Sequence, residues 1–255
     1  MSFGDFGTTP GKRRKRGSMP ASTNDVAAAL AERGASEGTT VVASAQSAGR
    51  GRLGREWFSP AGAGIYVSVV CRDALAAPHL TLAAGVAVAD GILAATGLPV
   101  QIKWPNDIVV DGAGRARRRK LAGILAEAST SAAGLQHVIL GFGVNMRAAA
   151  FPPQLPERTT SIEVELGRVA DSGAVVAESL AALASLVRQL SEGDRAPLLA
   201  RWRALSPSAI GTTVEWDTPS GTRAGTTAGI ADDGALLIRT GGRVERVISG
   251  ELTWA

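Results

Sequence analysis

The stretch SAGRGRLGREW, residues 47–57, contains three glycines and three arginines and ends in a tryptophan. Glycine lets the backbone move and approach a ligand closely, whereas arginine offers a planar set of donors that suits carboxylates and phosphates. This segment, called the Gly/Arg loop below, is therefore typical of a loop that stays loose until an anion binds. For an isolated Gly/Arg run, a solvated surface loop is an equally good interpretation.

The composition indicates a globular protein of 255 residues, with 45% hydrophobic and 20% charged residues. That length allows one large domain, or a large and a small one. The isoelectric point is about 9.8. However, residues 1–20 carry five basic residues and one acidic residue, which accounts for the whole net charge of +4. The rest of the chain is neutral overall, which argues against broad nucleic-acid binding.

Rare metal-ligating and thiol side chains exclude some function classes. Cys71 is the only cysteine, and His79 and His137 are the only histidines. The sequence therefore excludes an intramolecular disulfide and disfavours a zinc site. Residues 80–100 are apolar enough to raise the question of a membrane span, but their many small residues and Asp90 favour a buried core helix. Without a secretory signal pattern at the start, we expect a cytoplasmic protein.

The apolar periodicity and the turn residues predict an α+β protein. Helices are expected over 22–34, 78–97, 172–192 and 195–205, and strands over 39–45, 64–71, 100–104, 107–111, 121–129 and 137–146. From residue 211 onward, short strands alternate with Gly, Asp and Ser turns, which is typical of a small β-barrel. We expect a mixed β-sheet with helices on one face, followed by this barrel. The corresponding division is a disordered basic tail over 1–20, a catalytic domain over 21–208 and a β domain over 209–255.

Lysine and asparagine are rare in this chain and fall in motif-like places. Only four of the 27 basic residues are lysines, and the two outside the N-terminal tail are Lys103 and Lys120. In a chain that prefers arginine so strongly, a lysine indicates a position where a compact ammonium is needed. The three asparagines, Asn24, Asn106 and Asn145, also have structural explanations as a helix cap, a turn residue and a strand end.

Four segments in this order, GRGRLGREW, KWPND, KLAGIL and GFGVNM, resemble the biotin protein ligases, and the terminal SGELTW is similar to the end of that family's last domain. The resemblance covers about residues 22–255. It implies a catalytic α/β domain followed by an SH3-like barrel. It also implies that biotin and MgATP form biotinoyl-5′-AMP and pyrophosphate, after which a lysine of a biotin carboxyl carrier domain takes the biotinoyl group. The expected partner is acetyl-CoA carboxylase or another biotin-dependent carboxylase.

The resemblance assigns catalytic roles to charged residues. Lys120 is expected to contact the biotin carboxylate and the α-phosphate, where a fixed cation stabilises developing charge. Arg52 is expected to contact the same anions, and Arg50 and Gly51 to belong to the loop that closes over them. Asp107 would either help to hold Mg²⁺ or orient the incoming lysine, and the sequence does not decide between these roles.

The remaining assignments are binding residues. The neutral ureido ring of biotin needs amide and hydroxyl groups, and the resemblance places Ser22, Thr23 and Gln46 there, with Asn24 beside them. The other expected binding residues are Gly49 in the loop, Gly123 through its backbone, Asn106 and Asn145 at the nucleotide, and Lys103, which either pairs with Asp107 or touches the intermediate. Trp57 and Trp104 are not assigned to the site, because tryptophans are more often packing residues.

Two departures and two alternatives stay open at this level. Family members usually have a strand directly before STN, whereas here residues 11–20 cannot form an apolar strand. The short N-terminal segment leads us to expect a ligase without a DNA-binding repressor domain. One alternative is a lipoate–protein ligase, which shares the fold and the adenylate chemistry. The other is a nucleic-acid-binding regulator, which would use the basic runs KRRKR and RARRRK. The sequence also leaves a homodimer open.

Overall fold

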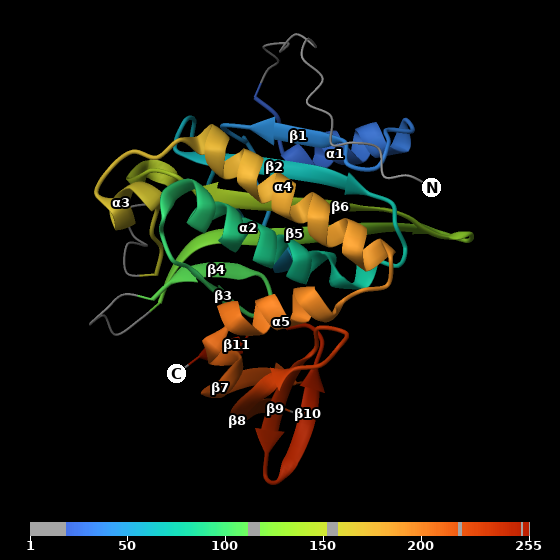
Figure 1. The fold of residues 1–255 in the computed structure, drawn as a ribbon, viewed down its shortest axis with the longest axis vertical. Coiled ribbons are helices and arrows are strands. Elements are labelled where there is room, and N and C mark those ends of the chain that lie inside the picture. Colours follow the sequence, from blue (N-terminus) through green and yellow to red (C-terminus); the bar gives the residue numbers. More distant parts are fainter. Residues whose placement is uncertain (1–18, 112–117, 152–157, 219–220, 251, 255) are drawn as a thin grey trace.

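Two antiparallel β-sheets organise the residues that the computed structural model describes, which are 19–111, 118–151, 158–218, 221–250 and 252–254 (Figure 1). The larger sheet has six strands in the order β1-β2-β6-β5-β4-β3. Their bounds are β1 Thr40–Ala43, β2 Gly64–Cys71, β3 Gln101–Lys103, β4 Asp107–Val110, β5 Arg119–Ser131 and β6 Gly134–Asn145. The predicted strands are therefore confirmed, with β5 and β6 extended into a long hairpin.

The pairing differs from the mixed sheet that we expected, because the described pairs between these strands are all antiparallel. Strands β3 to β6 follow one another through short connections, and such connections allow only antiparallel neighbours. The long helical crossover after β2 leads to β3 at the opposite edge of the sheet, so it creates no parallel pair beside β2.

One face of the sheet is covered by α2 (Leu80–Thr96) and α4 (Ser172–Ser191), which lie across it in Figure 1. By length and composition, the segments Ala77–Thr96 and Ser172–Ser191 could each cross a membrane. Helix α2 is buried along most of its length between the sheet and α4, as expected for a core helix. Helix α4 instead buries one stripe, which includes Val175, Leu183 and Val187.

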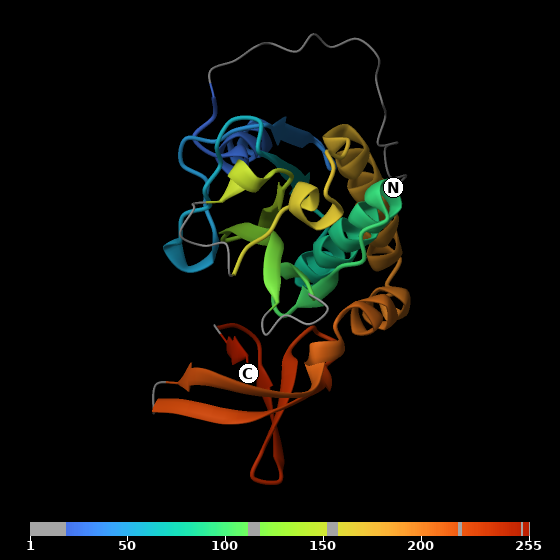
Figure 2. The same ribbon diagram turned by 90° about the vertical axis from the view of Figure 1, so that its left-hand side faces the viewer.

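Helix α1 (Thr23–Glu32) lies on the opposite face of the sheet, so the helices are not confined to one face as we expected (Figure 2). Its N-terminus is capped by the Ser22 hydroxyl, and Gly34 follows its end with a φ of +86°. Ala27 and Ala31 pack against Val70 of β2 and Ile139 of β6. Strand β2 is buried along its whole length because helices cover both of its faces at this edge.

The smaller sheet has the order β10-β9-β8-β7-β11, and it follows helix α5 (Ala196–Leu205). Its strands are β7 Ile210–Thr218, β8 Gly221–Ile230, β9 Leu236–Thr240, β10 Arg243–Val247 and β11 Leu252–Trp254. A small C-terminal β unit is thus confirmed, whereas its SH3-like class and the domain boundaries stay predictions. The short helix α3 (Ile162–Leu166) was not expected, and the predicted tail falls mostly outside the described residues.

The turn between β8 and β9 attaches the smaller sheet to the larger unit. The backbone carbonyl oxygen of Asp232 lies 2.7 Å from Nε2 of His79, and the indole N–H of Trp104 donates to the carbonyl oxygen of Gly234 at 3.0 Å. Trp104 is buried in the main core. Because Asn106 follows Trp104 by two residues, this attachment lies next to one end of the site described below.

The close approach of α2 and α4 depends on the missing side chain of Gly91. A Cβ atom there would lie 2.3 Å from Oγ and 2.6 Å from the backbone nitrogen of Ser179. We therefore expect Gly91→Val to lower the free energy of unfolding by about 1–3 kcal/mol through overpacking. The matched change Ala94→Val, on the exposed side of α2, should cost less than about 1 kcal/mol. Urea unfolding measures both, and equal losses would contradict the packing argument.

Candidate functional site

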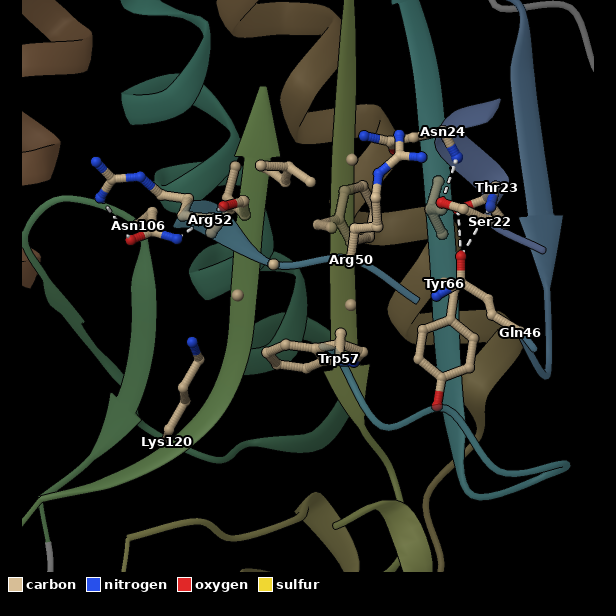
Figure 3. Close-up of a pocket in the computed structure, with 18 residues that line it drawn as sticks. Ser22, Thr23, Asn24, Gln46, Arg50, Arg52, Trp57, Tyr66, Asn106 and Lys120 are labelled. Atoms are coloured by element: carbon tan, nitrogen blue, oxygen red, sulfur yellow. Dashed lines mark hydrogen bonds between the residues drawn. The ribbon is translucent and has the colours of Figure 1, made fainter. Parts of the chain in front are cut away.

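A pocket lies on the part of the sheet face that α1 leaves uncovered, beneath the Gly/Arg loop (Figure 3). Its floor comes from β5 and β6, one end from the start of α1, and its cover from the loop. The lining residues are Ser22, Thr23, Asn24, Gln46, Arg50, Gly51, Arg52, Trp57, Tyr66, Val67, Asn106, Lys120, Gly123, Ile124, Leu125, Gly141, Phe142 and Gly143. The structure therefore brings together most of the predicted site residues from distant parts of the chain.

The floor of the pocket is made of glycines, and the ring of Trp57 lies on it. A Cβ atom on Gly123 or Gly143 would lie 2.9 Å from the Trp57 side chain. The ammonium of Lys120 lies 5.0 Å from the centroid of the same ring, within the range of a cation–π contact. Trp57 is thus an apolar wall of the pocket, and our assignment by residue type missed it. The signal was present in GFG, residues 141–143, because alternating glycines leave one face of a strand bare.

One end of the pocket is a network of neutral polar groups. Gln46 Oε1 accepts hydrogen bonds from the backbone nitrogen and the hydroxyl of Thr23, at 2.7 and 3.2 Å. Ser68 Oγ lies 2.8 Å from Thr23 Oγ1 and 2.5 Å from Asn24 Oδ1. The amide of Gln46 donates to the hydroxyl of Ser59 at 3.1 Å. Thr23, Asn24 and Gln46 are therefore held in fixed orientations by Ser59 and Ser68, which the sequence did not single out, while the predicted Ser22 caps α1 by accepting from the Asn24 backbone nitrogen.

The other end carries positive charge. Lys120 Nζ forms an ion pair with Asp107 Oδ1 at 2.6 Å, and both side chains are partly exposed. Arg52 donates to Asn106 Oδ1 at 3.2 Å, while the Asn106 amide donates to the carbonyl oxygen of Ile124 at 2.8 Å. Asn106 therefore fixes the loop arginine against the sheet without neutralising its charge.

Arg50 extends to the neutral end instead, where it meets two carboxylates. Its guanidinium pairs with Asp25 of α1 and donates to both carboxylate oxygens of Glu127 at 2.9 and 3.1 Å. Hydrogen bonding to Asp25 is the main cause that raises the pKa of Arg50, and Glu127 adds to it against the opposing effect of burial. Neither carboxylate was among the predicted site residues, because an acidic residue on a helix or strand gives no sign of its partner.

Four predicted residues lie outside the pocket lining: Asp107, which pairs with Lys120 as described above, and Gly49, Lys103 and Asn145. A Cβ atom on Gly49 would meet the carbonyl oxygen of Trp57, so this glycine packs against the other end of the loop. The buried Asn145 donates to the carbonyl oxygen of Thr160 at 3.0 Å. Lys103 lies opposite Asp107 in the antiparallel pairing of β3 with β4. Its ammonium lies 5.8 Å from the centroid of the Trp254 ring. Their predicted ligand contacts stay predictions.

The arrangement suits an elongated ligand with three chemically different parts. Neutral donors and acceptors gather at one end, an aromatic wall stands over glycines in the middle, and Lys120 and Arg52 lie at the far end. A neutral polar head, an apolar middle and an anionic tail would match these features in order. The two cations at one end would also stabilise negative charge that develops during a reaction there.

Comparison with known proteins identifies relatives along most of the chain. The model of the biotin/lipoate A/B protein ligase family matches residues 17–145. A bifunctional ligase/repressor BirA from Bacillus spizizenii is 36% identical over 236 residues, covering 91% of this chain and 70% of the relative. A biotin–[acetyl-CoA-carboxylase] ligase from Paracoccus denitrificans is 36% identical over 225 residues, covering 86% and 90%. The biotin protein ligase from Aquifex aeolicus, solved with biotin and ATP, superposes with a TM-score of 0.77 at 26% identity, covering 93% and 96%.

A double-mutant cycle tests whether Trp57 rests on the glycine floor. We expect Gly143→Val to lower the free energy of unfolding by about 1–3 kcal/mol, since the new side chain would clash with the indole. In a Trp57→Ala background the same change should cost at least about 0.5 kcal/mol less, because the clashing partner is gone. Urea unfolding of the four proteins gives the coupling, and an identical cost in both backgrounds would contradict the contact.

Proposed function

Because this chain belongs to the biotin/lipoate A/B protein ligase family, and within it to the biotin protein ligases, we propose that the pocket binds biotin and ATP. The protein is an ATP-dependent ligase that attaches biotin to protein. The observation that carries the assignment of roles is the order of the pocket: a neutral polar end, an aromatic wall over glycines, and an end with two cations. Biotin presents a ureido head, an apolar ring and chain, and a carboxylate in the same order.

The neutral end recognises the ureido ring. Thr23, Asn24 and Gln46 offer hydroxyl and amide groups, and the Thr23–Gln46 hydrogen bonds together with contacts to Ser68 hold these groups before the ligand arrives. A site built from fixed polar groups discriminates strongly, because a ligand that leaves them unpaired loses their hydrogen bonds. This preorganisation supports biotin over a lipoyl head group, which has no ureido donors or acceptors.

The cationic end performs the first step. A biotin carboxylate oxygen attacks the α-phosphorus of ATP, a new P–O bond forms, and the bond to the pyrophosphate leaving group breaks. Lys120 and Arg52 offset the repulsion between the two anions and stabilise charge in the transition state. Arg52 is suited to this role because it meets a neutral amide, and among the described residues it forms no ion pair with a carboxylate.

Mg²⁺ enters as part of the nucleotide substrate, and the residues present fit it. Mg²⁺ takes oxygen ligands and is commonly held by one or two carboxylates together with phosphate oxygens and waters. Asp107 offers a partly exposed carboxylate beside Lys120 at this end of the pocket. Asp107 would hold the ion there, where it would offset phosphate charge. The alternative role of Asp107, orientation of the acceptor lysine, uses the same position.

In the second step the neutral amine of an acceptor lysine attacks the acyl carbon of biotinoyl-AMP. The new C–N bond forms, the bond to AMP breaks, and the amine loses a proton. Lys120 stays close to the α-phosphate in both steps, and this phosphate belongs to the leaving AMP in the second. The name of the Paracoccus denitrificans relative supports acetyl-CoA carboxylase as the acceptor. We place the acceptor lysine in the biotin carboxyl carrier domain of that enzyme. Cytoplasmic location fits the need for ATP. We also propose that the protein does not bind DNA, because its charge outside residues 1–20 is neutral. A homodimer is a further part of the proposal.

Replacement of the ammonium tests the chemistry. Lys120→Ala should slow pyrophosphate release from biotin and MgATP on the order of 100-fold or more, because a fixed cation at the reacting atoms is lost. The measurement is pyrophosphate formation together with the mass of a carrier domain, with Arg201→Ala on the distant side of α5 as the control. No pyrophosphate from the parent protein, or a gain of lipoate instead of biotin in mass, would overturn the assignment.

Loop closure can be tested separately through Arg52. We expect Arg52→Gly to release free biotinoyl-AMP and to label other proteins less selectively, because the loop loses its contact with Asn106 and no longer excludes water. Filtration of the enzyme after one turnover, without acceptor, gives the fraction of intermediate released. Retention as tight as in the parent protein would count against closure by this residue.

A further inference from the structure

Glu127 of β5 connects the cover of the pocket with its biotin-recognition end. Its Oε2 atom accepts a hydrogen bond from the Asn24 amide at 2.6 Å. The same carboxylate accepts two hydrogen bonds from the Arg50 guanidinium, at 2.9 and 3.1 Å. In Figure 3 the Arg50 side chain reaches toward Asn24, away from Lys120. One carboxylate thus contacts a loop residue and a pocket residue at once.

Two arginines tie the Gly/Arg loop to the body of the protein at separate points. Arg50 joins it to α1 and β5 through Asp25 and Glu127, and Arg52 joins it to the Asn106 corner. Leu53, which follows Arg52 directly, is 71% exposed and has a φ of +57°. Side-chain contacts of the arginines therefore have a large share in holding this part of the loop over the pocket.

The carboxylates at Arg50 leave it little capacity for a ligand anion. Its charge is matched by two acidic side chains, and its guanidinium points to the neutral end of the pocket. Asn24 is then restrained from two sides, since Ser68 lies 2.5 Å from its Oδ1 while Glu127 accepts from its amide nitrogen. A displaced Glu127 would release both the loop and the Asn24 side chain.

We propose that Glu127 is a positioning residue that couples closure of the Gly/Arg loop to the orientation of Asn24, and that Asp25 shares only the first of these tasks. The inference rests on the proposed function and deepens it. Arg50 acts through these carboxylates as a latch, whereas Arg52 faces the reacting anions. Neither carboxylate touches the reacting atoms, so their loss affects retention and recognition rather than the bond-forming step.

The two carboxylates give different expected results. Asp25→Asn and Glu127→Gln each remove a charge from the latch but leave an oxygen that can accept a hydrogen bond. Release of biotinoyl-AMP should rise about two- to five-fold in each, as expected for a partly exposed ion pair, with little change in the KM for biotin. Glu127→Ala also removes the acceptor of the Asn24 amide, so it should raise the KM for biotin about ten-fold in addition. In all three, kcat with saturating substrates should stay within about three-fold of the parent.

The matched control is Asp90→Asn. It removes a similarly exposed ion pair, between Asp90 of α2 and Arg201 of α5, with side chains 32% and 43% exposed. This pair lies on the helical face of the molecule, away from the pocket. Release of the intermediate, the KM for biotin and kcat should all match the parent. A general loss of stability would change the control as well, so the comparison isolates the latch.

Trypsin provides a readout that does not depend on ligase activity. The loop contains three cleavage sites after Arg50, Arg52 and Arg55. Without substrates, Asp25→Asn, Glu127→Gln and Glu127→Ala should be cut in the loop faster than the parent and the Asp90→Asn control. If the parent forms no biotinoyl-AMP, the proposed function fails while the cleavage rates still test the latch. Parent-like cleavage in these variants, or faster cleavage with unchanged release of the intermediate, would overturn the inference.

Discussion

The site depends on the bare backbone of three glycines in the central strands. A Cβ atom on Gly141 would lie 2.3 Å from Asn24 Oδ1, and one on Gly123 or Gly143 would lie 2.9 Å from the Trp57 side chain. These positions lie on the same sheet face as α1, at the start of the helix and in the part of the face that it leaves uncovered. The start of α1 and the end of the Gly/Arg loop can therefore both lie directly against the sheet. A polar residue and an aromatic residue thus share one floor, and a long amphiphilic ligand can run between them.

Charge is distributed around that floor in two separate groups. Lys120 is balanced by Asp107 at one end, and Arg50 is balanced by Asp25 and Glu127 at the other. Arg52 contacts a neutral amide between the sheet and the loop. Since a nearby carboxylate reduces the attraction that a cation exerts on an incoming anion, the arginines of one motif take different tasks. Arg50 fastens the loop to α1 and β5, and the contact of Arg52 with a neutral amide fits the substrate-binding role that we propose for it.

The smaller sheet is attached beside the cationic end. The β8–β9 turn contacts His79 and Trp104 through its backbone carbonyl groups, and Trp104 is followed closely by Asn106. The corner that orients Arg52 thereby has support from the core on one side and from the C-terminal unit on the other. Such support fits the proposed role of Lys120 and Arg52, which requires cations at fixed distances from two anions.

The sequence by itself determined the helices and strands whose signals are local, such as the capped α1 and the apolar β2, together with the family and the positions of Lys120 and Arg52. It did so because caps, periodicity and motifs depend on neighbouring residues. Only the tertiary structure decided that α1 lies opposite α2, that the sheet is antiparallel, and that Trp57 rests on glycines. It also decided the partners of Arg50, since Glu127 lies 77 positions away. Such contacts arise from strand order and register, which bring distant segments to one face.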